Sequence, residues 1–316
     1  MHYRKLGHSG LSVSEIAFGT WLTFANATDI DTARLNIKAA LAAGINFFDT
    51  ADEYAKGGAE QVLGETLADV PRKDVVVATK LFFPMSEAIN DRGLSRKHIA
   101  EAVDASLDRL GMDYIDVYYC HRFDPATPLD ETVRAMDDLV RAGRILYWGV
   151  SQWTAPQISE MMKVVREMRA ARPIANQPLY NMVSRGIEAE IMPACAKEGL
   201  GIVAYSPLAQ GLLTGKYTSM SDVPADSRAA DNRQNFFIKR SFLNEANIAK
   251  AQKMAAVATR LGIAPGLLAL AWCLRRAEVS SVIIGASRPQ QVHDNAAAAG
   301  IKLDESVQKE LEEILA

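Results

Sequence analysis

The sequence predicts a (β/α)8 TIM barrel, with a β-hairpin before it and extra helices at the C-terminal end. Between residues 16 and 300, short apolar runs alternate with longer stretches of helical period, which is typical of βα units around a parallel sheet. Eight such runs can be counted, and several helical stretches end at a glycine before the next run. A single domain spanning residues 1–316 fits, because barrels of this length are common.

The expected strands are short and rich in Ile, Val, Tyr or Phe, the residues that favour extended structure. They are 16–18, 46–49, 75–80, 115–121, 145–150, 174–177, 201–206 and 279–285. A helical stretch follows each of them, and the stretch 32–43 shows why: its apolar positions repeat with helical spacing and Gly44 can terminate it in a left-handed conformation.

The remaining segments are assigned by the same patterns. Residues 3–6 and 11–13 flank a turn rich in Gly, His and Ser, and predict a hairpin that could plug the N-terminal end of the barrel. Residues 207–243 predict a long functional loop. Helices are expected at about 244–261, 265–277 and 304–315.

Composition excludes several classes of function. The chain has 35 Lys and Arg against 38 Asp and Glu, a formal net charge of -3, which argues against a nucleic-acid-binding surface. The N-terminal segment carries no apolar stretch long enough for a signal peptide or membrane span, so a cytoplasmic protein without a membrane partner is expected. The three cysteines are widely spaced and predict buried thiols, and the five scattered histidines predict no metal site.

Polar residues stand at the C-terminal ends of successive expected strands, and a TIM barrel brings these ends to one face. Asp49, Lys80 and His121 end the second, third and fourth strands, and Tyr54 follows shortly after Asp49. A phenol has a pKa of about 10 and donates weakly at neutral pH, so a neighbouring cation is expected to lower the pKa of Tyr54. These four residues therefore predict acid–base chemistry on a carbonyl oxygen, with Lys80 tuning Tyr54 and Asp49 holding Lys80 charged.

Each residue alone also has a structural interpretation. Asp49 could cap the following turn, Lys80 could be a strand-end charge reaching water, and His121 could be a hydrogen-bonded structural residue.

The segment 283–289 runs from a strand into an expected helix and could bind a phosphate at the helix N-terminus, or simply start a well-capped helix. The Walker-like segment 211–216 is one residue short and lacks the following Ser or Thr, so it is not an NTPase loop.

These motifs resemble the aldo-keto reductases over nearly the whole chain. Phe48-Asp49-Thr50-Ala51 with Tyr54, then Thr79-Lys80, then the segment 116–121 look like the family's tetrad-bearing segments in the right order. Within the family, the segments 19–21, 121–125, 131–136 and 147–149 are similar to the branch of the voltage-gated potassium channel β-subunits and their bacterial relatives.

The resemblance implies an NADPH-dependent enzyme that reduces aldehydes or ketones, with Asp49, Tyr54, Lys80 and His121 as its catalytic group. Around the nicotinamide it implies Thr20, Trp21, Asp49, Ser151, Gln152, Gln177 and Tyr205. Around the pyrophosphate and its covering loop it implies Ser206, Pro207, Leu208, Gln210, Gly211, Lys216 and Arg228. Around the adenosine and its 2′-phosphate it implies Gly285, Ser287, Arg288, Gln291, Asp294 and Asn295, and cationic or donor groups there favour NADP(H).

The substrate pocket is expected to involve Trp21, Tyr54, Phe82 and His121, with Phe24 and Phe83 as further aromatic walls.

Two departures from the family pattern matter. The channel β-subunits have Asn at the position of His121, so the imidazole favours a working enzyme over an accessory or sensor subunit of that type, which stays the alternative. Many reductases have Asn after the serine, where this chain has Gln152. Relatives also suggest a homo-oligomer.

Overall fold

The computed structural model describes residues 1–21, 30–225, 227–232 and 234–316, and in this part of the chain eight parallel strands close into a barrel. Their order around the barrel follows the sequence, with the last strand pairing with the first. They are β3 (Ile16–Gly19), β4 (Phe47–Asp49), β5 (Val76–Leu81), β6 (Ile115–Cys120), β7 (Ile145–Ser151), β8 (Ala175–Gln177), β9 (Gly201–Tyr205) and β10 (Val279–Ile284).

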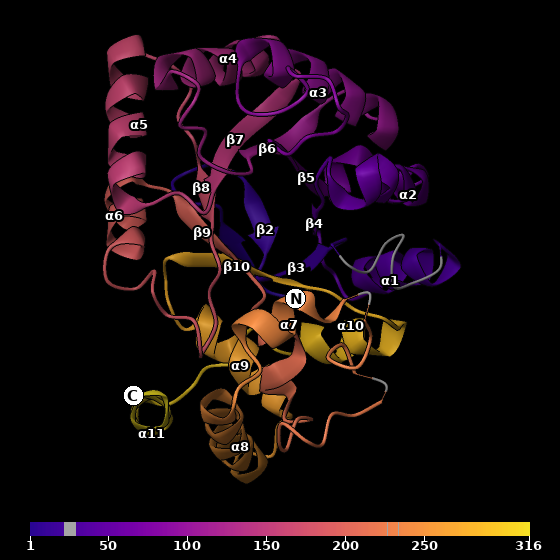
Figure 1. Ribbon diagram of the computed structural model, residues 1–316, viewed down its shortest axis with the longest axis vertical. Helices are drawn as coiled ribbons and strands as arrows, with labels where there is room; N and C mark the ends of the chain where they lie inside the picture. The colour runs from indigo at the N-terminus through magenta and orange to yellow at the C-terminus, as the bar shows by residue number, and fades with distance from the viewer. Residues whose placement is uncertain (22–29, 226, 233) are drawn as a thin grey trace.

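Amphipathic helices cover the barrel from outside, and Figure 1 shows α1 to α6 as an arc around the strands. They are α1 (Ile30–Ala42), α2 (Gly58–Leu67), α3 (Arg96–Leu110), α4 (Leu129–Arg141), α5 (Ala155–Met168) and α6 (Ile191–Glu198). Their buried faces form one hydrophobic core with the outward-facing residues of the strands. The predicted (β/α)8 barrel is therefore confirmed.

The hairpin closes the N-terminal end of the barrel, as the sequence predicts. It pairs β1 (Tyr3–Lys5) with β2 (Ser12–Ser14) in antiparallel register. Leu6 and Val13 are fully buried in the cluster that fills the barrel's interior. Gly7 has φ +57°, and a Cβ there would lie 2.5 Å from the carbonyl oxygen of Ile174, so the close approach of the hairpin to the barrel requires glycine.

Observed strand ends differ from the predicted ones by at most one residue. Asn46, predicted as strand, instead joins the hairpin to the barrel, because its side chain accepts a hydrogen bond from the Ser14 backbone at 2.8 Å. His121 lies just beyond β6, where its backbone N–H still donates to the carbonyl of Leu81 at 2.9 Å. Apolar patterning cannot mark such boundaries, because hydrogen bonding decides them.

The long segment between β9 and α8 carries helical structure of its own. It contains the short helices η3 (Ala209–Thr214) and α7 (Asn235–Ser241), where only a loop is predicted. The two helices predicted before the last strand are present as α8 (Glu245–Arg260) and α9 (Pro265–Leu274), and α10 (Pro289–Ala296) follows β10. Across the described residues no single helix has the length and apolar character of a membrane span. Helices α8 and α9 have that length and character only when they are taken together, and the chain bends by 96° between them.

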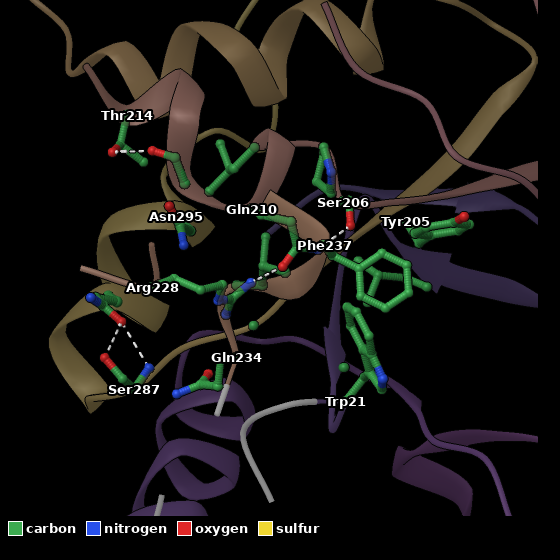
Figure 2. A pocket seen from close by; sticks show the side chains of 18 of the residues that line it. Trp21, Tyr205, Ser206, Gln210, Thr214, Arg228, Gln234, Phe237, Ser287 and Asn295 are labelled. Atoms are coloured by element: carbon green, nitrogen blue, oxygen red, sulfur yellow. Dashed lines mark hydrogen bonds between the residues drawn. The ribbon is translucent and has the colours of Figure 1, made fainter. Parts of the chain in front are cut away.

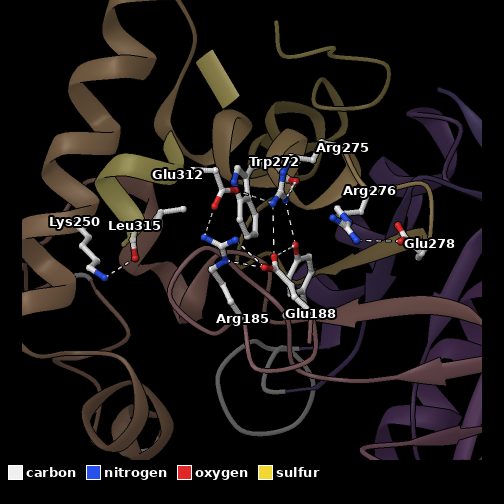
Figure 3. Close-up of polar contacts among 10 residues, drawn as sticks. Arg185, Glu188, Lys250, Trp272, Arg275, Arg276, Glu278, Glu312 and Leu315 are labelled. Carbon is white, nitrogen blue, oxygen red and sulfur yellow. Dashed lines mark hydrogen bonds and ion pairs between the residues drawn. The ribbon is translucent and has the colours of Figure 1, made fainter. Parts of the chain in front are cut away.

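The C-terminal helix α11 (Glu305–Leu315) is attached to the barrel by charged contacts, shown in Figure 3. Glu312 accepts from Arg185 at 2.6 Å and from Arg275 at 3.1 Å. The Arg275 guanidinium also lies 3.6 Å from the ring centroid of Trp272, so it joins α9 to α11.

The three cysteines are free and buried, and burial raises the pKa of the Cys120 thiol to about 12, as expected of structural thiols.

Candidate active site

A cavity of about 1600 Å³ opens over the C-terminal ends of the strands, where a TIM barrel collects its functional residues. Its wall runs from Asp49, Tyr54 and His121 at one end to the start of α10 at the other. The segment around η3 and α7 forms another part of the wall, and Figure 2 shows its side chains facing those of Trp21 and Tyr205. The volume exceeds that of a pocket for one small molecule and leaves space for a dinucleotide and a substrate together.

The ammonium of Lys80 lies beneath this cavity and has no contact with solvent. It donates to Oδ1 of Asp49 at 2.6 Å, to the backbone carbonyl of Thr50 at 2.7 Å and to the hydroxyl of Tyr54 at 3.4 Å. Its three N–H groups therefore have three acceptors. Because Lys80 approaches a lone pair of the Tyr54 oxygen, the phenolic proton is left to point elsewhere, toward the cavity that Tyr54 lines.

The pKa of Tyr54 moves in the direction opposite to the expected one. Burial raises it well above the usual value of a phenol, and the Asp49 carboxylate raises it further. The lowering expected from Lys80 is not found in the protein alone, because burial outweighs it and the Lys80 ammonium is paired with Asp49 at 2.6 Å. Tyr54 consequently holds its proton at neutral pH and can act as a proton donor. Burial lowers the pKa of Lys80, while Asp49 opposes this effect.

His121 borders the cavity beside Tyr54 and is 5% exposed. Burial lowers the pKa of its imidazole well below the usual value, and the nearby charges of Lys80 and Arg122 lower it further. The ring is therefore neutral and has one nitrogen that donates and one that accepts. The ring centroids of Tyr54 and His121 are 6.0 Å apart, close enough for both side chains to reach one substrate oxygen.

Polar side chains at the ends of β7, β8 and β9 continue the wall. The side-chain amide of Gln177 donates to Oδ2 of Asp49 at 2.7 Å, while the hydroxyl of Ser151 donates to the backbone carbonyl of Gln177 at 2.8 Å. The ring of Tyr205 borders the same space. These groups can hold a flat, amide-bearing ring against Tyr205, with Asp49 shared between this region and Lys80.

The far end of the cavity offers positive charge and backbone donors. Arg228 donates to the amide oxygen of Gln210, and the amide nitrogen of Gln210 donates to the Ser206 hydroxyl at 2.5 Å (Figure 2). Helix α10 begins without a side-chain cap, and although Pro289 has no N–H and Gln291 donates to the Arg288 carbonyl at 3.1 Å, the N–H of Gln290 can meet an anion. A phosphate-bearing ligand fits this end by its chemistry. The residues expected around a cofactor that border this part of the cavity are Ser206, Pro207, Leu208, Gln210, Gly211, Lys216, Arg228, Gly285, Ser287, Arg288, Gln291, Asp294 and Asn295.

Besides Lys80, which lies beneath the cavity, three predicted site residues do not border it. The hydroxyl of Thr20 is buried and donates to the Thr50 hydroxyl at 2.8 Å. Gln152 has φ +61° and turns its amide to the Tyr205 hydroxyl. Phe82 packs against the core while Phe83 borders the cavity, because neighbouring side chains after β5 point to opposite sides. Phe24, the other expected wall, lies outside the described residues.

Several residues of the cavity wall were not predicted. Glu53 directly precedes Tyr54 in the sequence, and Arg122 directly follows His121. This adjacency to predicted positions could have revealed both residues. Phe237 of α7 packs edge-on against Trp21 with ring centroids 5.0 Å apart (Figure 2). No sequence signal connects Phe237 with Trp21. Among the described residues, no group of three or more His, Cys, Asp or Glu side chains is arranged to hold a metal ion.

Comparison with known proteins identifies the family of the chain. A sequence model of the Aldo/keto reductase family matches residues 15–316. A protein of Oryza sativa subsp. japonica, named as a probable voltage-gated potassium channel subunit beta, is 44% identical over 95% of this chain and 92% of its own length. An Arabidopsis thaliana protein of the same name is 42% identical over the same shares. A Schizosaccharomyces pombe protein, named as a putative subunit of this kind, is 37% identical over 99% of this chain and 93% of its own length.

Proposed function

Since the chain belongs to the aldo/keto reductase family, we propose that it is an NADPH-dependent oxidoreductase that reduces aldehydes and ketones to alcohols with Tyr54 as the proton donor. The family supports an oxidoreductase with a nicotinamide cofactor and a small carbonyl substrate. The choice of NADPH rests on Arg288 at the uncapped start of α10, where a 2′-phosphate would meet charge and backbone donors.

The observation that carries the proposal is the contact of Lys80 with both Asp49 and Tyr54 at the base of the cavity. A bound nicotinamide supplies the hydride. Tyr54 gives its proton to the carbonyl oxygen, and the phenolate that results is stabilised by the Lys80 ammonium at 3.4 Å. His121 orients the same oxygen, while Ser151 and Gln177 hold the carboxamide against Tyr205. The phenolate then regains a proton from water.

The test is the variant Tyr54→Phe, which removes the proton donor and keeps the ring. We expect carbonyl-dependent NADPH oxidation to fall by about 100-fold or more, with the Kd for NADPH nearly unchanged. Tyr3→Phe is the matched control, because Tyr3 lies in the hairpin, where it donates to the Gly44 carbonyl. Turnover by Tyr54→Phe at the wild-type rate would refute the role of Tyr54.

A second function is suggested by the names of the potassium channel relatives, which are 37–44% identical over nearly the whole chain. In this reading the protein binds NADPH as an accessory or sensor subunit and turns over little. His121, which completes a proton-handling group beside Tyr54, favours the enzyme. Mixing the protein with NADPH and a panel of aldehydes distinguishes the two functions, because tight binding without turnover on any aldehyde would support the accessory role.

The proposal extends to the organisation of the protein. We propose one domain over residues 1–316, a cytoplasmic location and a homo-oligomeric assembly. Mass measurement in solution tests the assembly, and limited proteolysis tests the domain, since a single domain yields no stable internal fragment.

A further inference from the structure

The Nδ1 atom of His121 is a buried polar atom that has no hydrogen-bond partner among the described residues. An unsatisfied buried polar group costs about 1–3 kcal/mol, so a functional site retains one only for a reason. The carboxylate of Glu53 lies 3.7 Å away from this nitrogen, measured to Oε1. A small rotation of the half-buried Glu53 side chain brings the two atoms within hydrogen-bond distance.

The other faces of the imidazole are covered by rings. Phe83 lies edge-on at 5.0 Å and Tyr54 edge-on at 6.0 Å between ring centroids. Glu53 is therefore the side chain placed to serve Nδ1, and since His121 borders the cavity, Nε2 is the nitrogen left for a ligand. The imidazole is neutral, and the position of its single proton decides whether Nε2 donates or accepts.

We propose that Glu53 is a positioning residue that fixes which nitrogen of His121 carries the proton. The idea rests on the proposed function and adds a residue to it. When Glu53 is protonated, its hydroxyl donates to Nδ1, and the imidazole proton is then held on Nε2, where it donates to a carbonyl oxygen. When Glu53 is ionised, it accepts from Nδ1–H, and the free lone pair of Nε2 accepts from the hydroxyl of an alcohol. One carboxyl group thus decides whether Nε2 of His121 donates or accepts a hydrogen bond.

The charges around the pair set the pH range of this change. Burial raises the pKa of Glu53, while Arg122, Lys80 and Lys56 act in the opposite direction. Arg122 and Lys80 also keep His121 from ionising, and Asp49 is engaged by Lys80. The change therefore occurs above the usual titration range of a glutamate. Below that pH Nε2 donates to an oxygen in the cavity, and above it Nε2 accepts from a hydroxyl there.

The direct test is the tautomer of His121, read from ¹⁵N NMR spectra of histidine-labelled protein, with His121→Asn used to assign the signal. In the wild type we expect the proton to move from Nε2 to Nδ1 as the pH rises through the titration of Glu53. In Glu53→Gln this pH dependence should vanish, whereas Glu87→Gln, an exposed control outside the cavity wall, should behave as the wild type. A wild-type tautomer that is constant with pH, or unchanged pH dependence in Glu53→Gln, overturns the proposal. This measurement needs no turnover, so it is independent of the proposed reaction.

The kinetic test uses reduction of 4-nitrobenzaldehyde and oxidation of the matching alcohol across pH. We expect Glu53→Leu to lower kcat for reduction by roughly 3- to 10-fold, the effect of one hydrogen bond, and Glu53→Asp to restore part of it. Glu53→Gln should flatten the pH dependence of kcat in each direction. In the His121→Asn background, Glu53→Leu should change kcat by less than about twofold, because the two residues act as a unit. Equal losses in both backgrounds would show that Glu53 acts without His121 and would overturn the proposal.

Discussion

The Lys80 ammonium lies 2.6 Å from Oδ1 of Asp49, with 0% of the Lys80 side chain and 4% of the Asp49 side chain exposed. A charge pair this deeply buried depends on both partners, because either charge alone would have to be kept out of water without compensation. Lys80 also donates to the Tyr54 hydroxyl at 3.4 Å, so the position of the pair helps to hold the Tyr54 hydroxyl in place.

We expect Asp49→Asn to lower the free energy of unfolding by about 3–5 kcal/mol, because it leaves Lys80 buried without a counter-charge. Urea denaturation followed by tryptophan fluorescence measures the effect. Glu101→Gln is the control, since Glu101 pairs with Lys97 on the surface of α3 and should cost less than about 1 kcal/mol. Equal losses in the two variants would contradict the importance of burial for this pair.

The packing of α2 against α3 predicts a second effect. A Cβ at Gly64 would lie 2.2 Å from the backbone oxygen of Leu110, and backbone cannot move aside as a flexible side chain can. Gly64→Ala should therefore destabilise the protein by about 1–3 kcal/mol, measured as a lower midpoint of thermal unfolding. Gly58→Ala, in the same helix but with its nearest neighbour at 3.6 Å, should be neutral or slightly stabilising.

Arg288 is expected to select NADPH over NADH. Arg288→Ala removes a charge at the uncapped start of α10 and should weaken NADPH binding by about 10- to 100-fold, the value of a charge-assisted hydrogen bond, with little change for NADH. Fluorescence titration with each cofactor measures both Kd values. Arg276→Ala serves as control, because Arg276 pairs with Glu278 away from the cavity wall (Figure 3). An unchanged ratio of the two Kd values in Arg288→Ala would place the 2′-phosphate elsewhere.

Phe237 and Trp21 are expected to form one wall of the substrate pocket. Phe237→Ala removes a ring that lies edge-on at 5.0 Å from Trp21, and should lower kcat/KM for aromatic aldehydes by roughly 3- to 10-fold. The adjacent Phe236→Ala provides a matched control, since Phe236 is 61% exposed and does not border the cavity. Similar kinetics for the two variants would mean that α7 does not contact the substrate.

Glu188 links the loop after β8 to α9, and its ionisation contributes to stability. Although burial alone would raise its pKa, hydrogen bonds from Arg185 and Tyr180 hold the pKa below the usual value. Figure 3 shows the contact between Arg185 and Glu188. A carboxyl group with a lowered pKa in the folded state stabilises fully above its unfolded pKa, and this stabilisation is lost as the pH falls through the folded value.

Glu188→Gln should therefore lower the free energy of unfolding at pH 7 by about 1–3 kcal/mol, and the difference from the wild type should shrink toward acid pH. Denaturation curves recorded between pH 7 and pH 3 measure this trend. Glu310→Gln, a change on α11 that removes the surface partner of Arg260 at the end of α8, should show a small difference at every pH. A difference for Glu188→Gln that grows toward acid pH would reverse the assigned sign.

The sequence by itself determined the barrel and the meeting of its polar residues. Strand and helix periods predict eight βα units, and in a closed parallel barrel every strand ends on the same face. The pattern of strand ends therefore predicts that Asp49, Lys80 and His121 meet, although they are far apart in the chain.

Tertiary structure decided what depends on burial and side-chain direction. The pKa of Tyr54 rises because the site is buried, and no sequence pattern states how completely Asp49 neutralises Lys80. Phe83 rather than Phe82 reaches the cavity because the turn after β5 sets which side chain points inward. The approach of Phe237 to Trp21 joins segments more than 200 residues apart, and only packing in three dimensions determines such a contact.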